Sequence, residues 1–293
     1  MSAVILNGRK ISKQVQEEIQ EEISQFIANG KRAPKLGVIL VGEDIASALY
    51  VKNKQKACAQ IGIESFTKEV SSSVTHHELM QIIENMNRDT SIDGILLQLP
   101  LPEHLRSNEA EFLSAIHPSK DVDGFHPVNI GRLVLGLPAP ISCTPAGVMR
   151  LLEETHVDLE GKLCIILGRS NTVGKPLIQL LLQKNATVIS CHSKTRNLSD
   201  LTQQADILIA AVGKHSMVQA DMIKPGAIVI DVGINRLEDG SVRGDVDFAH
   251  VKEKASWITK VPGGVGPMTI AMLLKNTVFC YKNRKEAEDA YMA

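Results

Sequence analysis

The sequence has few aromatic side chains, almost no net charge and no long apolar run. Aromatic residues make up 3% of its 293 residues, which argues against the stacking surfaces of proteins that bind single-stranded nucleic acid. With a formal net charge of -1, the protein lacks the positive electrostatic potential that would attract nucleic acid or an acidic membrane surface. No apolar stretch approaches the length of a membrane span, about 20 residues. We therefore expect neither a nucleic acid nor a membrane as partner.

Secretion signals and cysteine pairs are also missing. Residues 1–10 contain no apolar signal-peptide core. The five cysteines are odd in number, widely spaced and without a CxxC pair, so they suggest neither a disulfide framework nor a zinc site. We expect a cytoplasmic protein, or an organellar one that has lost a transit peptide, and no bound metal.

Short apolar runs of strand length alternate with segments of helical periodicity along most of the chain. The length and the apolar content of 44% suit two domains with separate cores. Expected strands cover 36–41, 64–70, 94–99, 162–167, 186–191, 207–212, 227–232 and 257–261. Expected helices cover 8–28, 47–60, 76–87, 109–115, 173–183, 198–203 and 268–284, and one more begins at Thr144 as N-cap. This order predicts an α/β fold of parallel strands with helical crossovers.

Residues 117–140 interrupt this alternation with a stretch rich in proline, glycine and aspartate. We interpret it as an ordered connecting loop between domains, because apolar residues persist in it. Residues 1–140 would form an N-terminal α/β domain, and residues 141–267 a doubly wound, Rossmann-like domain. The last helix, within 268–293, is expected to pack back on the first domain.

A glycine-containing turn, GRSNTVGKP at 168–176, lies between an expected strand and an expected helix. Gly168 and Gly174 would let the backbone approach a pyrophosphate, and the helix N-terminus supplies N–H donors and partial positive charge. One glycine of GxGxxG is missing, so a tight turn that binds nothing is the alternative. The strand–turn–helix order favours a dinucleotide.

The residues after the next strand bear on the choice between NAD and NADP. An acidic residue there would bond the ribose of NAD, but the sequence has CHSKTR at 191–196 and no acid. The hydroxyl of Ser193 and the cations of Lys194 and Arg196 suit a 2′-phosphate, and Arg169 could add a third cation. The pattern favours NADP over NAD, with a solvated basic turn as the alternative.

Three polar residues in the first half are candidates for chemistry. Tyr50 and Lys54 lie four residues apart on an expected helix, so they share one face. Gln98 ends an apolar strand, where ligands bind in open parallel sheets and where a buried amide needs partners. The alternatives are a surface pair and an amide satisfied by neighbouring backbone. Short-chain dehydrogenases also have a YxxxK pair, but theirs follows the glycine turn, whereas this one precedes it.

Five motifs, in this order, resemble one known family. They are SxxYVxxK at 47–54, GILLQLPLP at 94–102, KDVDG at 120–124, GRSxxVGxP at 168–176 and PGGVGPMT at 262–269. Together they extend over essentially the whole chain. The sequence is similar to the bifunctional methylenetetrahydrofolate dehydrogenase/methenyltetrahydrofolate cyclohydrolase family. The resemblance implies a two-domain α/β enzyme with its active site in the cleft between a catalytic folate-binding domain and an NADP-binding domain.

The resemblance also implies roles for residues of the first domain. Lys54 would be the central catalytic residue, since hydrolysis needs a group that moves protons and activates water. Gln98 would orient Lys54, and Tyr50 would pack on the folate. Asp123 would accept hydrogen bonds from the pterin ring, with Asp121 as its close competitor.

In the second domain the resemblance implies a cofactor site and part of the substrate site. The cofactor residues would be Gly168, Arg169, Ser170, Val173, Gly174, Ser193 and Ile234. Pro262, Gly263 and Gly264 would approach the folate and the nicotinamide. Ser193 and Arg169 would hold the 2′-phosphate. The family implies tetrahydrofolate derivatives as substrates and a homodimer formed through the cofactor domain.

Two other functions fit parts of the pattern. A two-domain dehydrogenase similar to shikimate dehydrogenase would share the fold, but it would leave Gln98, KDVDG and PGGVGPMT without a role. A non-enzymatic sensor would bind NADP and turn nothing over.

Overall fold

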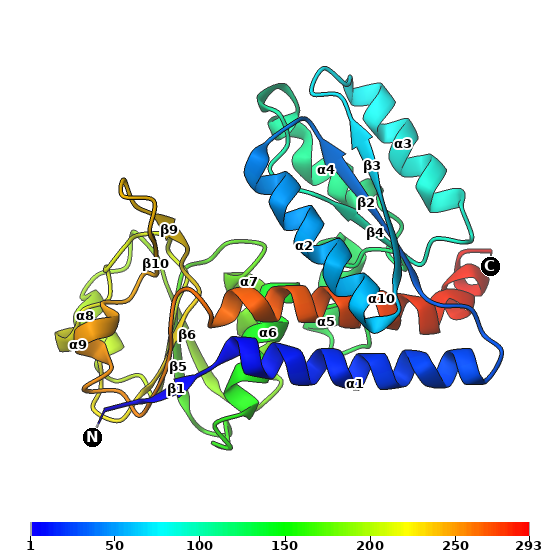
Figure 1. Cartoon of the computed structure of the whole chain (residues 1–293). Coiled ribbons are helices and arrows are strands. Elements are labelled where there is room, and N and C mark those ends of the chain that lie inside the picture. The colour runs from blue at the N-terminus through cyan, green and yellow to red at the C-terminus, as the bar shows by residue number, and fades with distance from the viewer. Residues whose placement is uncertain (1, 293) are drawn as a thin grey trace. The chain divides into compact units, whose positions relative to one another are not determined.

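The computed structural model describes residues 2–292, and it describes the side chains of these residues except those of 46 and 285–292. The chain divides into two compact units (Figure 1). Unit 1 comprises the segment up to Lys13 together with Ser142–Met272, and unit 2 comprises Gln14–Ile141 together with the segment from Leu273 onward. Within residues 2–292, no helix combines the length and the apolar composition that a membrane span requires.

Unit 1 is built on a six-stranded sheet in which every neighbouring pair is parallel. In spatial order its strands are β1 (Val4–Leu6), β11 (Trp257–Thr259), β8 (Ile228–Asp231), β7 (Ile207–Ala210), β5 (Leu163–Leu167) and β6 (Thr187–Cys191). The central strands β7 and β8 are buried along their whole length, as expected for a parallel sheet covered on both faces. This is the doubly wound arrangement that the alternation of strands and helices predicts.

The remaining elements of unit 1 are short. Its helices are α6 (Cys143–Glu153), α7 (Gly174–Leu182), α8 (Leu198–Thr202), η2 (Ala220–Met222) and α9 (Phe248–Val251). The strands β9 (Asn235–Arg236) and β10 (Val242–Arg243) form an antiparallel pair that the sequence analysis does not predict. The helix expected to begin at Thr144 has its N-cap at Ser142, so Thr144 lies in its first turn.

Unit 2 contains a three-stranded parallel sheet, ordered β3 (Glu64–Val70), β2 (Lys35–Val41) and β4 (Gly94–Leu97). Its helices include α2 (Ile45–Ile61), α3 (His76–Arg88), η1 (Glu103–Asn108), α4 (Glu109–Ala115) and α5 (Pro127–Val134). A capping box between Thr75 and Glu78 begins α3, whose buried face of Leu79, Ile83 and Met86 recurs at helical spacing. Two long helices, α1 (Gly8–Ala28) and α10 (Val265–Met292), contribute residues to both units.

Two further features differ from the sequence-based expectation. The first strand, β1, was not expected, and it pairs with β11 of unit 1, so the segment before Lys13 does not belong with residues 14–140. Three residues are too few to show an alternating pattern. The connecting stretch also contains a helix, α5, which has Pro127 in its first turn and a ring nitrogen of His126 as cap acceptor for Val128 N–H.

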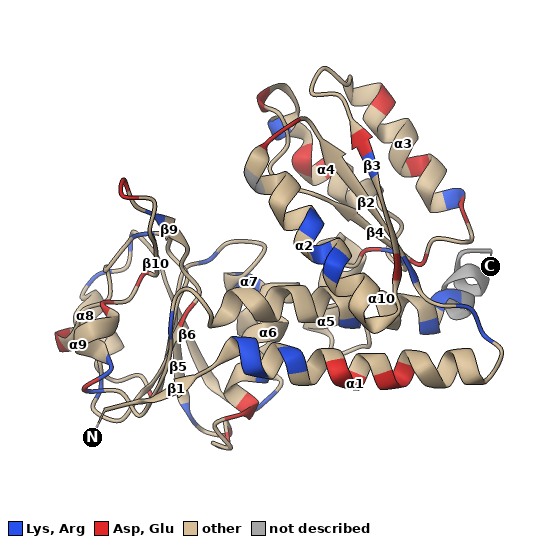
Figure 2. Cartoon of the chain, in the orientation of Figure 1, with Lys and Arg blue, Asp and Glu red and all other residues tan. Residues whose placement is uncertain are grey.

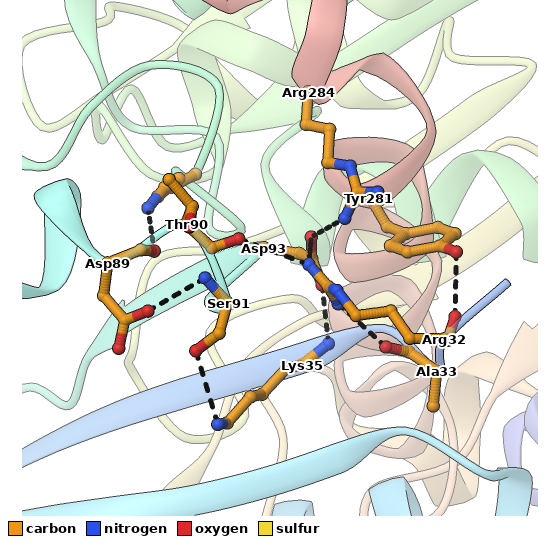
Figure 3. A network of polar contacts seen from close by, with 10 residues as sticks. Arg32, Ala33, Lys35, Asp89, Thr90, Ser91, Asp93, Tyr281 and Arg284 are labelled. Atoms are coloured by element: carbon orange, nitrogen blue, oxygen red, sulfur yellow. Dashed lines mark hydrogen bonds and ion pairs between the residues drawn. The ribbon is translucent and has the colours of Figure 1, made fainter.

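A buried carboxylate holds the amino end of the unit 2 sheet (Figure 3). The side chain of Asp93 is 1% exposed and accepts two hydrogen bonds from the Arg32 guanidinium, at 2.6 and 2.8 Å, and one from Lys35 N–H at 2.8 Å. Arg284 of α10 approaches the same carboxylate at 3.5 Å. The hydroxyl of Tyr281 donates to the carbonyl of Arg32, and both guanidinium groups lie over its ring. The cluster therefore ties α10 to the start of β2.

Replacing the carboxylate of Asp93 should destabilise the protein. In Asp93→Asn the amide oxygen could still accept, but the NH2 group would face donors, so we expect the free energy of unfolding to fall by about 1–3 kcal/mol. Urea unfolding followed by circular dichroism measures this change. The matched control is Glu84→Gln, which breaks the exposed pair with Arg88 on α3 and should cost less than about 1 kcal/mol. Equal losses in the two variants would contradict the assigned role of the cluster.

Candidate functional site

A lysine and an amide meet in unit 2. The helix that carries the lysine, α2, is capped by the side chain of Asp44 and ends at Gly62 in the left-handed conformation. Lys54 Nζ donates to Gln98 Oε1 at 3.0 Å. The other end of the same amide, Gln98 Nε2, donates to the carbonyl of Leu99 at 2.6 Å. Because an amide nitrogen can only donate, this second bond directs the amide oxygen toward the ammonium group.

Helix α2 is basic and carries several exposed apolar side chains. The helix contains three lysines and no acidic residue (Figure 2). Tyr50, one turn before Lys54, is 44% exposed, and Leu49 and Ile45, which point to other sides of the helix, are also exposed. Tyr50 and Lys54 are four residues apart and share one face of the helix, so an aromatic ring lies beside the ammonium group, which suits an aromatic ligand that is polar at one end.

The two aspartates of KDVDG have different surroundings. Asp121 is buried and accepts hydrogen bonds from Gly124 N–H at 3.0 Å, His126 N–H at 2.8 Å and Asn129 Nδ2 at 2.9 Å. Its carboxylate therefore holds the turn and the start of α5. Desolvation raises the pKa of Asp123 to about 6, in opposition to the charge of Lys54, and the charge of Asp121 adds to the rise. Asp123 thus lies within electrostatic reach of Lys54.

The glycine turn in unit 1 has no space for side chains at its glycines. Gly168 has φ +125°, and a Cβ atom there would lie 2.3 Å from the carbonyl oxygen of Ala211. A Cβ atom on Gly174 would lie 2.4 Å from the carbonyl oxygen of Gly168. The hydroxyl of Ser170 accepts from the N–H groups of Val173 and Gly174, at 3.1 and 3.4 Å. The turn is therefore compact where it leads into α7.

A pocket of about 300 Å³ opens beside this turn, at the carboxyl ends of β5, β6 and β7. It is lined by Leu167, Gly168, Arg169, Cys191, His192, Ser193, Leu198, Ala211, Val212, Lys214 and Met217. The structure thus brings Arg169 and Ser193 together, as the sequence analysis expects. None of these lining residues is acidic. The pocket suits an anionic ligand with an apolar portion.

The pocket also differs from the expected arrangement of cations. Lys194 and Arg196, which the sequence analysis places at the 2′-phosphate, are not among its lining residues, whereas Lys214 is. Sequence reasoning missed Lys214 because it follows a different strand, β7, far along the chain. One of the common doubly wound strand orders could have indicated it. In that order the third strand lies beside the first, as β7 lies beside β5 here, so the loops after both strands share one edge of the sheet.

The loop before α10 approaches neighbouring backbone closely. Gly263 has φ +110°, a conformation that side chains rarely adopt. A Cβ atom on Gly264 would lie 2.8 Å from Cβ of Thr259, and one on Gly8 would lie 1.7 Å from the carbonyl oxygen of Gly264. Pro262 follows a cis peptide bond. Ile234, which follows β8, is 54% exposed. Among the described residues, no group of three or more His, Cys, Asp or Glu side chains is arranged to hold a metal ion.

Comparisons with known proteins match both parts of the chain to domain models of one family. Residues 6–123 match the catalytic-domain model of tetrahydrofolate dehydrogenase/cyclohydrolase, and residues 142–285 match its NAD(P)-binding-domain model. The bifunctional protein FolD of Acetivibrio thermocellus is 52% identical over 95% of this chain and 96% of its own length.

Solved structures show the same likeness. The bifunctional enzyme FolD of Campylobacter jejuni superposes with a TM-score of 0.93 at 49% identity, covering 97% of this chain and 100% of its own. The Trypanosoma brucei enzyme, solved with NADP and an inhibitor, superposes with a TM-score of 0.91 at 37% identity, covering 97% of this chain and 99% of its own.

The alternative of an enzyme similar to shikimate dehydrogenase is not favoured. A shikimate dehydrogenase of Peptoclostridium difficile shares 13% identity with a TM-score of 0.51, over 85% of this chain and 92% of its own, which shows a common fold alone. The family models, in contrast, match both halves of the sequence, and the relatives match it nearly from end to end. The chain belongs to the tetrahydrofolate dehydrogenase/cyclohydrolase family.

Proposed function

We propose that this enzyme uses NADP to oxidise 5,10-methylenetetrahydrofolate and then hydrolyses the product to 10-formyltetrahydrofolate. The observation that carries the proposal is the hydrogen bond from Lys54 to Gln98, close to the carboxylate of Asp123. It provides a proton-transferring group with a fixed orientation in the part of the chain that matches the catalytic domain. The enzyme would act as a cytoplasmic homodimer without a metal and serve one-carbon metabolism, including purine, methionine and histidine biosynthesis.

The first reaction is a hydride transfer. The carbon that bridges N5 and N10 of the folate gives a hydride to C4 of the nicotinamide, which leaves the methenyl cation and NADPH. The protein has to hold the two carbons together and exclude water. On the folate side, we assign Tyr50 to packing against the substrate and Asp123 to accepting the N–H groups of the pterin ring. Pro262, Gly263 and Gly264 contribute backbone that a ligand can approach closely.

The second reaction is a hydrolysis. Water adds to the methenyl carbon and loses a proton, and the bond from this carbon to N5 then breaks, so that the formyl group remains on N10. We assign to Lys54 the proton transfers between the attacking water and the folate nitrogen. Gln98 holds the lysine, because its amide oxygen accepts from Nζ while its amide nitrogen is held by Leu99. Gln98 is therefore a positioning residue in this reaction.

The cofactor would bind along the carboxyl ends of the unit 1 strands. We assign the pyrophosphate to the turn that contains Gly168, Ser170, Val173 and Gly174, and the nicotinamide end to Ile234. Arg169 and Ser193 line one pocket and would hold the 2′-phosphate. The absence of an acidic residue among the groups that line this pocket supports NADP over NAD, since an acid is what bonds the free ribose hydroxyls of NAD.

The first test is an assay of the purified protein with 5,10-methylenetetrahydrofolate and either NADP or NAD. We expect reduced cofactor to form, with a higher kcat/KM for NADP. A second assay follows added methenyltetrahydrofolate, which should disappear faster than it does spontaneously. Reduced cofactor without faster methenyl loss would refute the hydrolase role. Binding of NADP without turnover in either assay would instead support a sensor.

Lys54→Met should separate the hydrolysis from cofactor binding. The substitution keeps the length of the side chain but removes the group that transfers protons, so we expect methenyl hydrolysis to fall by about 100-fold or more. The dissociation constant of NADP should not change, because Lys54 does not line the dinucleotide pocket. Lys52→Met, at an exposed lysine of the same helix, is the matched control and should retain wild-type hydrolysis. Hydrolysis that survives in Lys54→Met would remove the lysine from the mechanism.

Folate binding should weaken in acid through Asp123. The raised pKa means that this carboxylate takes up a proton as the pH falls through about 6, at a higher pH than an ordinary aspartate, and the neutral acid is a poorer acceptor for the pterin N–H groups. We expect KM for the folate to be low above this pH and to rise below it. In Asp123→Asn, KM should be raised by about tenfold at pH 7.5 and should no longer depend on pH in this range. A pH dependence that persists in the variant would assign the titration to another group.

A further inference from the structure

One wall of the dinucleotide pocket is held by a buried carboxylate. The wall consists of residues 211–214, the loop after β7, of which Ala211, Val212 and Lys214 line the pocket. The Asp245 side chain is fully buried and lies behind this loop. Its Oδ2 accepts from Val212 N–H at 2.7 Å and Gly213 N–H at 3.0 Å, and its Oδ1 accepts from Lys214 N–H at 2.8 Å. Three consecutive backbone donors therefore converge on one carboxylate.

Asp245 is itself fixed by a second buried carboxylate, that of Asp231 at the end of β8. The two oxygens of Asp231 accept from the N–H groups of Gly233, Asp245 and Val246, at 2.9 to 3.0 Å. Asn235 Nδ2 adds a fourth donor to Asp245, at 2.9 Å. The backbone of Gly233 packs closely against this carboxylate, since a Cβ atom on Gly233 would lie 2.2 Å from the carboxylate of Asp245. The loop after β7 is thus attached to the end of β8 through the two buried carboxylates of Asp245 and Asp231.

This attachment determines where the backbone of Lys214 lies. Lys214 and Arg169 are the lysine and the arginine that line the pocket. Ser193 supplies a hydroxyl, and none of the residues lining the pocket is acidic. An ammonium group on a flexible chain binds a phosphate as a point charge, which complements the planar guanidinium of Arg169. We propose that Lys214 binds the 2′-phosphate of NADP and sets the preference over NAD, and that Asp245 positions it by holding the backbone of residues 212–214.

The proposal rests on the use of NADP proposed above, and Lys214→Met tests its first half. Titration calorimetry with NADP and with NAD measures both dissociation constants. We expect the affinity for NADP to fall by about tenfold while that for NAD stays the same, because NAD has no 2′-phosphate. Lys214→Arg, which keeps the charge, should restore most of the affinity. Lys184→Met, at an exposed lysine of unit 1 that does not line the pocket, is the matched control and should bind both cofactors as the wild type does.

The outcomes separate this inference from the cofactor assignment. If the wild type does not prefer NADP, the cofactor assignment fails and the role of Lys214 fails with it. If the wild type prefers NADP and Lys214→Met keeps the full preference, only the role of Lys214 is refuted. An equal loss of affinity for NADP and NAD also refutes it, because Lys214 would then bind a part that the two cofactors share.

Asp245→Asn tests the positioning half. Its amide can accept from fewer of the three backbone donors, so the loop should move and the benefit of the Lys214 charge should be lost. In the Asp245→Asn background, Lys214→Met should therefore change NADP affinity by less than twofold, whereas independent effects would multiply. Full multiplication of the two effects would refute the coupling. Asn235→Ala, which removes one donor from Asp245, is the milder variant if Asp245→Asn does not fold, and it should reduce the effect of Lys214→Met partially.

Discussion

Buried carboxylates that need hydrogen-bond donors organise the loops of both units. Removing an aspartate from water costs several kcal/mol unless N–H groups or cations surround it. Asp93 meets this requirement with Arg32 and Lys35 N–H, and Asp121 meets it with two backbone donors and an asparagine. Asp231 and Asp245 meet it almost entirely with backbone N–H groups. Each carboxylate therefore imposes one conformation on a loop that has no regular structure of its own.

The candidate site residues themselves lie mostly in loops that follow strands. Within unit 2, Gln98 follows β4, and its amide meets Lys54 of α2. Within unit 1, the glycine turn follows β5, Ser193 follows β6, Lys214 follows β7 and the Pro262 loop follows β11. Parallel strands bring their carboxyl ends to one edge of a sheet, so residues far apart in the sequence can contribute to one site. The proposed chemistry depends on this geometry more than on any single motif.

The pattern of apolar residues was enough to predict most elements of the fold. Continuous apolar runs such as LCIIL and ILIA indicated buried parallel strands, and the helix 8–28 was predicted with its observed bounds. The elements that were missed are short or depend on distant partners. The three residues of β1 form a strand because β11 supplies the other side of the ladder, and the two-residue strands β9 and β10 form only against each other. No window of local sequence contains that information.

For the site, the sequence by itself determined the types of residue available and the family. Side-chain type and spacing indicated Lys54, Gln98 and the glycines of the turn, and the resemblance to the family implied a role for the two aspartates of KDVDG. The tertiary structure decided which of them meet. Asp121 binds the turn and α5, whereas Asp123 lies within electrostatic reach of Lys54. Lys214 lines the dinucleotide pocket, and Lys194 and Arg196 do not. The physical reason is that a pocket is defined by distances between segments, and these distances follow from sheet order and from buried hydrogen bonds, neither of which is visible in the spacing of residues along the chain.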